Sequence, residues 1–163
     1  MDLIESIVKL HSTRSFKQKE IPREALRNIL EAGRHTPTSH NIQPWHFIIV
    51  SDHETKEKIA KGTAEFIEKS AIVIVGCGDP EESPKMYELE VAIAMQTMVV
   101  AAWTQGVGSC WVDVGKNQKE VREMLDIPEK LRVVALVALG YPDEPSKPSW
   151  KKPFNEVIHY GKY

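Results

Sequence analysis

The chain has 163 residues, and its 21 Lys+Arg and 23 Asp+Glu give a formal net charge of −2. This length fits one domain that buries its own core, and a hydrophobic content of 42% excludes a wholly disordered chain. The near-neutral charge argues against a nucleic-acid partner, because nucleic-acid binders are normally clearly basic. Cys77 and Cys110 are too few for a disulfide framework, so a reducing cytoplasm is the expected compartment.

The first third of the chain predicts two helices, a strand and a third helix. Residues 3–8 place apolar side chains at helical spacing behind Asp2, which can serve as an N-cap, and the charges nearby exclude a signal peptide. Pro22 suits the first turn of the second helix. Residues 45–50 are rich in strand-forming side chains, and Asp52 can cap the charged helix that follows.

The remainder alternates strands with helices. Residues 71–77 and 131–139 are near-continuous apolar runs, typical of strands covered on both faces. A long helix is expected over about 85–105, and its most apolar part, 91–103, is shorter than the ~20 residues of a membrane span. No membrane partner is therefore expected. Two further elements are a short strand over 110–114 and a helix that begins with a capping box formed by Asn117 and Glu120.

These elements predict an α+β or α/β class, and the pattern leaves the strand order open. Prolines at 142, 145, 148 and 153 favour an extended tail without regular structure. The tail still carries Trp150 and Phe154, with Val157 and Ile158, so we expect it to pack on another surface.

Several common sites are missing from the sequence. There is no dinucleotide-binding glycine fingerprint, no P-loop and no nucleophile elbow, and the six histidines and two cysteines lack metal-ligand spacing. No metal is therefore expected. Cys110 follows a Gly-Ser pair and could be read as a thiol nucleophile, but a small buried cysteine beside Trp111 is the favoured interpretation.

Three segments carry candidate chemistry. Lys9 to Arg14 offers two cations, a hydroxyl and an imidazole, which suits an anion such as phosphate as well as a solvated basic loop. Thr36 to Trp45 presents uncharged hydrogen-bonding groups between two prolines, which favours a polar ring or a polyol over an ordinary turn. Gly106 to Trp111 has glycines that let a backbone approach a ligand, although a helix end would explain one of them.

Together these segments resemble the FMN-dependent nitroreductase family. That family has an early R-R-S-x-R-type motif, a P-S-x-x-N-x-Q-P-W loop, a G-L-G-S-C-W segment and a basic C-terminal tail. The corresponding residues here are Lys9 to Arg14, Pro37 to Trp45, Gly106 to Trp111, and the Lys151-Lys152-Pro153 run. Their order and spacing agree along essentially the whole chain.

The resemblance implies a fold and an assembly. The expected fold is α+β, with a central mixed or antiparallel sheet flanked by helices, as one FMN-binding domain over 1–163. Family members are intertwined homodimers with two FMN molecules at the subunit interface. The extended C-terminal arm, about 142–163, would then embrace the partner, and the apolar helix 91–103 would form part of the dimer core.

The resemblance also implies the residues that contact FMN. One subunit would supply Lys9, His11, Ser12 and Arg14, with Arg14 near the flavin pyrimidine. The other subunit would supply the loop, and the glycine segment would lie along the flavin edge, while the tail lysines meet the phosphate. These further residues are Pro37, Thr38, Ser39, Asn41, Gln43, Gly106, Val107, Gly108, Ser109, Lys151 and Lys152.

Two departures from the family pattern affect this site. Leu10 replaces the first motif arginine, so Lys9 or the tail lysines must substitute as phosphate ligands. The chain also lacks the insertion that larger relatives carry between the regions of Asp79 and Gly106, so a single helix occupies that place and the site is more open or depends more on the partner.

The implied activity is an NAD(P)H-dependent oxidoreductase without a protein nucleophile. NADH or NADPH would pass a hydride to flavin N5, and a nitroaromatic, a quinone or a similar small oxidant would then take it in a ping-pong cycle. Two alternatives remain open. One is a different flavin reaction on the same scaffold, such as dehalogenation, enoyl reduction or flavin fragmentation. The other is a non-enzymatic protein that binds or senses flavin.

Overall fold

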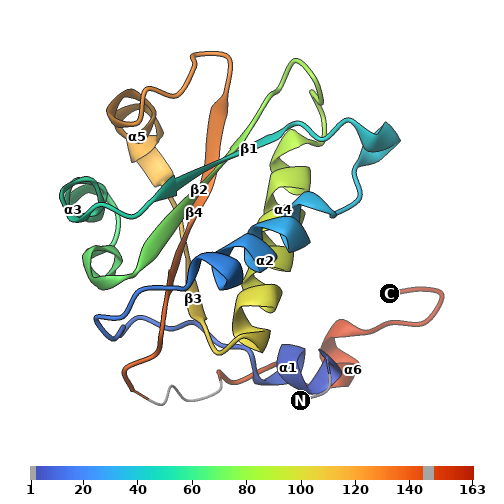
Figure 1. The fold of residues 1–163 in the computed structure, drawn as a ribbon. Coiled ribbons are helices and arrows are strands. Elements are labelled where there is room, and N and C mark those ends of the chain that lie inside the picture. The colour runs from blue at the N-terminus through green and yellow to red at the C-terminus, as the bar shows by residue number, and fades with distance from the viewer. Residues whose placement is uncertain (1–2, 145–148) are drawn as a thin grey trace.

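The computed structural model describes residues 3–144 and 149–163 (Figure 1). The helices are α1 (Leu3–Lys9), α2 (Arg23–Arg34), α3 (His53–Gly62), α4 (Tyr87–Thr104), α5 (Gln118–Met124) and α6 (Phe154–Val157). The strands are β1 (Trp45–Val50), β2 (Ile72–Gly78), β3 (Gly108–Val112) and β4 (Arg132–Gly140). Three short 3-10 helices are η1 (Ser39–Asn41), η2 (Glu65–Lys69) and η3 (Gly115–Asn117).

The four strands form one antiparallel sheet in the order β1-β2-β4-β3. The α+β class is therefore confirmed, and of the two sheet types expected the antiparallel one is found. The two apolar runs of the sequence become β2 and β4 in the middle of the sheet, and all seven residues of β2 are buried. Strands with no solvent-facing side need apolar side chains on both faces, so their sequences do not alternate.

Two hydrophobic layers cover the sheet. Ile72 and Ile74 of β2 pack in the layer that contains the buried face of α4 together with Ile29 of α2. Val73 and Val75 point the other way, into the layer with Ile59 of α3 and residues of η2 and α5. This alternation follows from the two-residue period of a strand. In Figure 1, α2 and α4 lie on one side of the sheet and α3 and α5 on the other.

The sequence correctly predicted a strand and a helix cap that depend only on neighbouring residues. The strand over 45–50 is β1, and the Asp52 carboxylate caps α3 by accepting from the backbone N–H of Thr55 at 2.8 Å. The capping box at Asn117 is wrong. Its side chain does not cap α5 but donates to the carbonyl of Gly62, and so ties the start of α5 to the end of α3. The expected N-cap Asp2 lies outside the described residues.

The two terminal segments bury almost nothing within the chain. Helix α1 forms as predicted, but its four apolar side chains at 3, 4, 7 and 8 are all at least half exposed, and Ser6 is the one buried residue. The C-terminal segment contains the one-turn helix α6, contrary to the expectation of no regular structure. Every residue from 149 to 163 is exposed, including Trp150 at 76% and Phe154 at 69%. Pro145 and Pro148 lie outside the described residues.

Candidate functional site

The first and third motifs lie side by side. Ser12 forms an isolated parallel bridge with Ser109 at the outer edge of β3, and the Thr13 N–H donates to the Ser109 carbonyl at 2.8 Å. A Cβ on Gly108 would come within 2.5 Å of the Thr13 hydroxyl oxygen, so a side chain at position 108 would push the two segments apart. The glycine at the start of β3 therefore serves the contact between the two motifs.

The carboxyl end of α4 completes this cluster. Trp103 lies edge-on to the His11 ring with centroids 4.6 Å apart, and the His11 Nδ1 is 2.8 Å from the carbonyl of Lys9. Gly106 has a φ of 74°, which reverses the chain from α4 toward β3. Of the glycine segment Gly106 is exposed, whereas Val107, Gly108 and Ser109 are buried. The part of this segment that is open to a ligand within the chain is therefore the turn at Gly106.

The cations of the candidate site differ in how they are engaged. The Lys9 ammonium lies 2.5 Å from the Glu5 carboxylate, one helical turn back. Arg14 is exposed, forms no ion pair within residues 3–144 and 149–163, and holds its guanidinium 6.0 Å from the centroid of the Phe66 ring. Lys151 and Lys152 are exposed on the C-terminal arm. Arg14 is therefore the cation that this cluster presents most directly to an anionic group.

The second motif forms a tightly folded loop around η1. The Gln43 N–H donates to the Thr38 hydroxyl at 3.0 Å, and the Gln43 side-chain amide donates to the Asn41 carbonyl at 2.9 Å. Three of its residues, His40, Asn41 and Gln43, have φ between 51° and 57°. Such conformations are unfavourable for side-chain-bearing residues and persist where the surroundings hold them. Pro37, Ser39, Asn41 and Gln43 are exposed, and Thr38 is half-buried.

A buried carboxylate holds this loop from beneath. Glu90 of α4 is 2% exposed, and its two carboxylate oxygens accept from the Ser39 N–H at 2.8 Å and from the Ser83 hydroxyl at 2.7 Å. The sequence pattern predicted the long helix over about 85–105 but assigned no role to Glu90. A carboxylate directly before the apolar run 91–103 was the signal that could have identified it.

The end of the same loop is fixed by a second acid. The Asp79 N–H donates to the Pro44 carbonyl at 2.9 Å, and the Asp79 carboxylate, at 1% exposure, lies 2.6 Å from the Lys130 ammonium. The hydrogen bond from Lys130, with a further one from the Glu81 N–H, holds the pKa of Asp79 below its usual range. The loop is thus anchored to both ends of the segment that joins β2 to α4.

Within one chain, the second motif is far from the other two. It contacts α4 at Glu90, whereas the cluster of the first and third motifs contacts α4 at Trp103, 13 positions further on. At 1.5 Å per residue this is about 20 Å along the helix. Figure 1 shows η1 beyond one end of α4 and the start of β3 at the other. The structure therefore brings together Ser12, Arg14 and Gly106 but not Asn41.

Unpaired polar atoms lie at the carboxyl end of α4. Two buried side-chain polar atoms among the described residues have no hydrogen-bond partner, the Thr13 hydroxyl and the Trp103 indole N–H. Both belong to the place where the first and third motifs meet, near the exposed turn at Gly106, whereas the guanidinium of Arg14, the next residue after Thr13, is directed toward Phe66 of η2. Buried polar groups are normally hydrogen-bonded, so these two atoms are available to a water or to a ligand at this place.

Neither cysteine has the surroundings of a nucleophile. Burial raises the pKa of Cys77 to about 12, and it also raises that of Cys110, with Arg14 and Ser12 opposing the shift. The favoured interpretation of Cys110 as a small buried residue, 2% exposed, is confirmed. Among the described residues, no group of three or more His, Cys, Asp or Glu side chains could hold a metal ion, and no helix is long and apolar enough to cross a membrane.

Comparison with known proteins agrees with this architecture. A family model described as "Putative TM nitroreductase" matches residues 2–163. An Archaeoglobus fulgidus protein named "Putative NADH dehydrogenase/NAD(P)H nitroreductase" is 32% identical over 151 residues, which cover 88% of this chain and 87% of that protein.

Two solved structures are similar over nearly the whole chain. An FMN-dependent nitroreductase from Clostridium difficile has a TM-score of 0.91 and 28% identity, covering 98% of this chain and 99% of its own. The NADPH:FMN oxidoreductase from Vibrio harveyi, solved with NAD⁺, has a TM-score of 0.91 and 25% identity, covering 99% of this chain and 77% of its own. The match of the family model along the chain, supported by these relatives, shows that the chain belongs to the nitroreductase family.

Proposed function

We propose that this protein is an NAD(P)H-dependent oxidoreductase that holds FMN in a site shared between two copies of the chain. The observation that carries the proposal is the cluster at the carboxyl end of α4. There the first and third motifs meet around the unpaired Thr13 hydroxyl and Trp103 indole N–H. The names of the relatives support the cofactor and the reductant, since they include an FMN-dependent nitroreductase and an NADPH:FMN oxidoreductase.

The chain's own residues divide the work of binding. Arg14 would lie beside the pyrimidine end of the flavin, where a cation stabilises negative charge, and His11 and Ser12 would contact the cofactor from the same segment. Lys151 and Lys152 would meet the phosphate, because Leu10 cannot and Lys9 is engaged with Glu5. The partner's copy of the loop 37–43 would supply neutral hydrogen-bonding groups to the ring and the ribityl chain.

The second copy is needed for two reasons. The loop and the cationic cluster of one chain are about 20 Å apart along α4, too far for both to grip the same flavin ring. The chain also exposes apolar side chains in three places, α1, the outer face of α4 at Leu89 and Ile93, and the arm at Trp150 and Phe154. A second copy that packs on these surfaces would bury them and bring its loop to the cluster.

The mechanism needs positioning rather than a protein nucleophile. Bound FMN would supply a hydride acceptor and donor at N5, so that NAD(P)H and the oxidant use the same face in turn. Arg14 would favour the reduced cofactor by its charge, and the buried Glu90 would keep the loop in the shape that orients the ring. Cys77 and Cys110 are both buried free thiols, which supports a reducing compartment such as the cytoplasm as the place of the reaction.

An absorption spectrum of the purified protein, recorded after addition of FMN and removal of the excess, tests the proposal. We expect a bound flavin spectrum that bleaches when NADH or NADPH is added without oxygen and returns when a quinone or a nitroaromatic follows. A protein that retains no flavin would contradict the proposal. Flavin that binds but does not bleach would favour the non-enzymatic alternative, and bleaching without reoxidation by either oxidant would favour another flavin reaction on this scaffold.

A further inference from the structure

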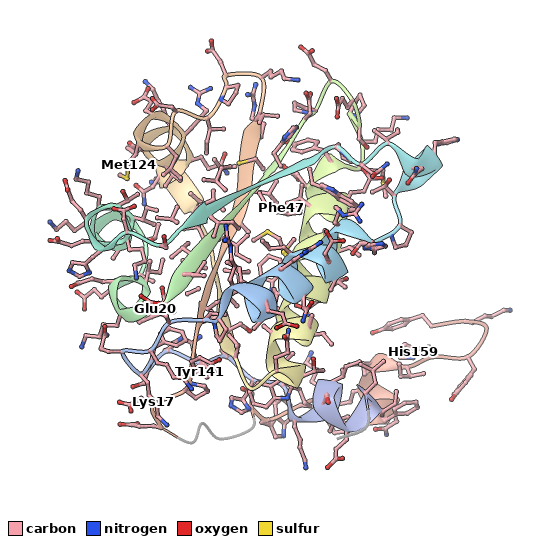
Figure 2. All side chains as sticks on the ribbon, viewed as in Figure 1. Lys17, Glu20, Phe47, Met124, Tyr141 and His159 are labelled. Atoms are coloured by element: carbon pink, nitrogen blue, oxygen red, sulfur yellow. The ribbon has the colours of Figure 1, made fainter. Side chains whose placement is uncertain are left out.

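A basic cavity lies outside the motifs of the flavin site, although Lys69, one of its lysines, also lines a neighbouring pocket together with Arg14. It has a volume of about 540 Å³ and is formed between the segment 17–21 and the junction of η2 with β2. Four lysines line it, Lys17, Lys19, Lys56 and Lys69, against one carboxylate, Glu20. Figure 2 shows Lys17 and Glu20 on the opposite side of the molecule from His159 of the C-terminal arm. Arg14 is not among the residues that line this cavity.

Lys56 is the unusual member of this set because it is buried. The residue is 6% exposed, and its ammonium donates to the carbonyl of Ser70 at 2.5 Å and lies 3.4 Å from that of Ala71. No carboxylate within the described residues comes within ion-pair distance of it. Burial lowers the pKa of Lys56, although the charges of Asp52 and Glu68 oppose the shift. A buried ammonium held by neutral carbonyls leaves positive charge to be compensated.

The other lysines add to that charge. Within residues 3–144 and 149–163, Lys17, Lys19 and Lys69 form no ion pair, and the Lys19 ammonium lies 4.1 Å from the centroid of the Tyr141 ring. Gln18 and Ser51 also line the cavity and supply neutral donors. A concave site with several ammonium groups and neutral donors suits a compact group with more than one negative charge and several acceptor oxygens.

We propose that this cavity binds the phosphate group of a small molecule, at a site separate from that of the flavin. Lys56 forms its floor, Lys17 and Lys69 close on the phosphate from the rim, and Gln18 and Ser51 donate to its remaining oxygens. The same chemistry would serve free phosphate and a nucleotide phosphate, and the two differ in whether anything beyond the phosphate contributes to binding.

The test follows the amide spectrum of the protein, saturated with FMN so that any flavin phosphate site is filled, as inorganic phosphate replaces chloride at constant ionic strength. We expect saturable shifts at residues 17–21, 56 and 70–72. The Lys17→Met/Lys69→Met variant should bind phosphate at least about tenfold more weakly. Lys56 is left intact because its ammonium also holds the backbone carbonyls of Ser70 and Ala71, so that its removal would disturb the fold. Titration with AMP separates the sources, since equal affinity indicates phosphate alone and tighter binding indicates a nucleotide.

A matched control removes the same charge elsewhere. Lys58→Met/Lys61→Met changes two lysines of α3 that pair with Glu54 and Glu57 and do not line the cavity, so it should change the affinity no more than about twofold. The proposal is overturned if the shifts do not saturate, if both double variants weaken binding equally, or if Arg14→Ala abolishes binding while Lys17→Met/Lys69→Met does not.

Discussion

The two ends of α4 carry opposite kinds of chemistry and are held in opposite ways. At the amino end, the neutral loop around η1 is tied to its own chain by Glu90 and Asp79, both almost fully buried. At the carboxyl end, Arg14 is exposed without an ion-pair partner among the described residues, and the Thr13 hydroxyl and Trp103 indole are unpaired. The loop at the amino end is therefore held by hydrogen bonds within the chain, whereas polar and charged groups at the carboxyl end are free to bind other molecules.

This difference indicates how the site is assembled. A loop held rigidly by its own chain can be offered to a neighbour without losing its shape, and a cluster with unpaired donors can receive it together with a ligand. The exposed apolar side chains of α1 and of the arm lie on segments that bury almost nothing in their own chain. Removing the arm, the cation or the anchors of the loop should therefore affect the assembly, the cofactor and the loop in different ways.

Deleting residues 149–163 should have the largest effect. The deletion removes Trp150 and Phe154. Aromatic anchors in a dimer interface contribute about 2 kcal/mol or more each to the free energy of association. We expect the dimer dissociation constant, measured by sedimentation, to rise at least about a hundredfold, and bound FMN to fall with it. Removing Lys162 and Tyr163 alone is the control. A deletion variant that is still a flavin-loaded dimer at low micromolar concentration would show that the arm is not part of the interface.

Arg14→Ala should weaken the binding of FMN by the cationic segment of the site. A charge-assisted contact contributes about 1.5–3 kcal/mol, so the FMN dissociation constant should rise about tenfold or more, and the midpoint potential should become more negative. Arg14→Lys keeps the charge and should restore part of both. Unchanged affinity and potential in Arg14→Ala would refute the role of this residue.

Glu90→Ala should loosen the loop around η1, at the amino end of α4. It leaves the Ser39 N–H and the Ser83 hydroxyl without their acceptor, at a cost of about 1–3 kcal/mol in the free energy of unfolding. Hydrogen exchange should become faster at residues 36–44, and FMN should bind more weakly. Glu90→Gln retains one oxygen for the Ser39 N–H and should behave more mildly. If exchange in this loop does not change in Glu90→Ala, the carboxylate does not hold the loop.

The smallest expected effect is the pH dependence of the Asp79–Lys130 pair. Because Lys130 lowers the pKa of Asp79 in the folded protein, the pair stabilises the fold above the ordinary aspartate range, near pH 4, and that contribution is lost as the pH falls through the lowered pKa. In urea unfolding, the stability difference between the wild type and Lys130→Met should be constant from pH 8 to about pH 6 and shrink below about pH 4. A difference that persists unchanged at pH 3 would mean that Lys130 acts by packing alone.

The sequence predicted those parts of the fold that depend on local patterns. Residues 45–50 and 71–77 have strand composition whatever surrounds them, and the cap at Asp52 needs one side chain and one N–H. The pattern at Asn117 fits a cap equally well, but there the carbonyl of Gly62, 55 residues earlier, competes for the side chain and wins. Contacts of this range are not visible in a local window.

The candidate site was predictable to a similar degree. The three motifs follow from their residue types, but their distances depend on α4. The length of this helix separates the second motif from the other two, which meet near its carboxyl end. Glu90 was missed because its role depends on two partners that are 51 and 7 residues away. Likewise, the apolar face of α1 reads as a core-facing helix, although in the structure it faces outward.

The shared site is tested most directly by mixing two inactive variants, Arg14→Ala and Asn41→Ala, unfolding them and refolding them together. Random pairing makes about half of the dimers mixed, and each mixed dimer has one site with both changes and one with neither. Bound FMN and NAD(P)H oxidation should therefore recover to about a quarter of the wild-type values. No recovery, with mixed dimers shown to form, would place both segments in the site of one chain and contradict the account.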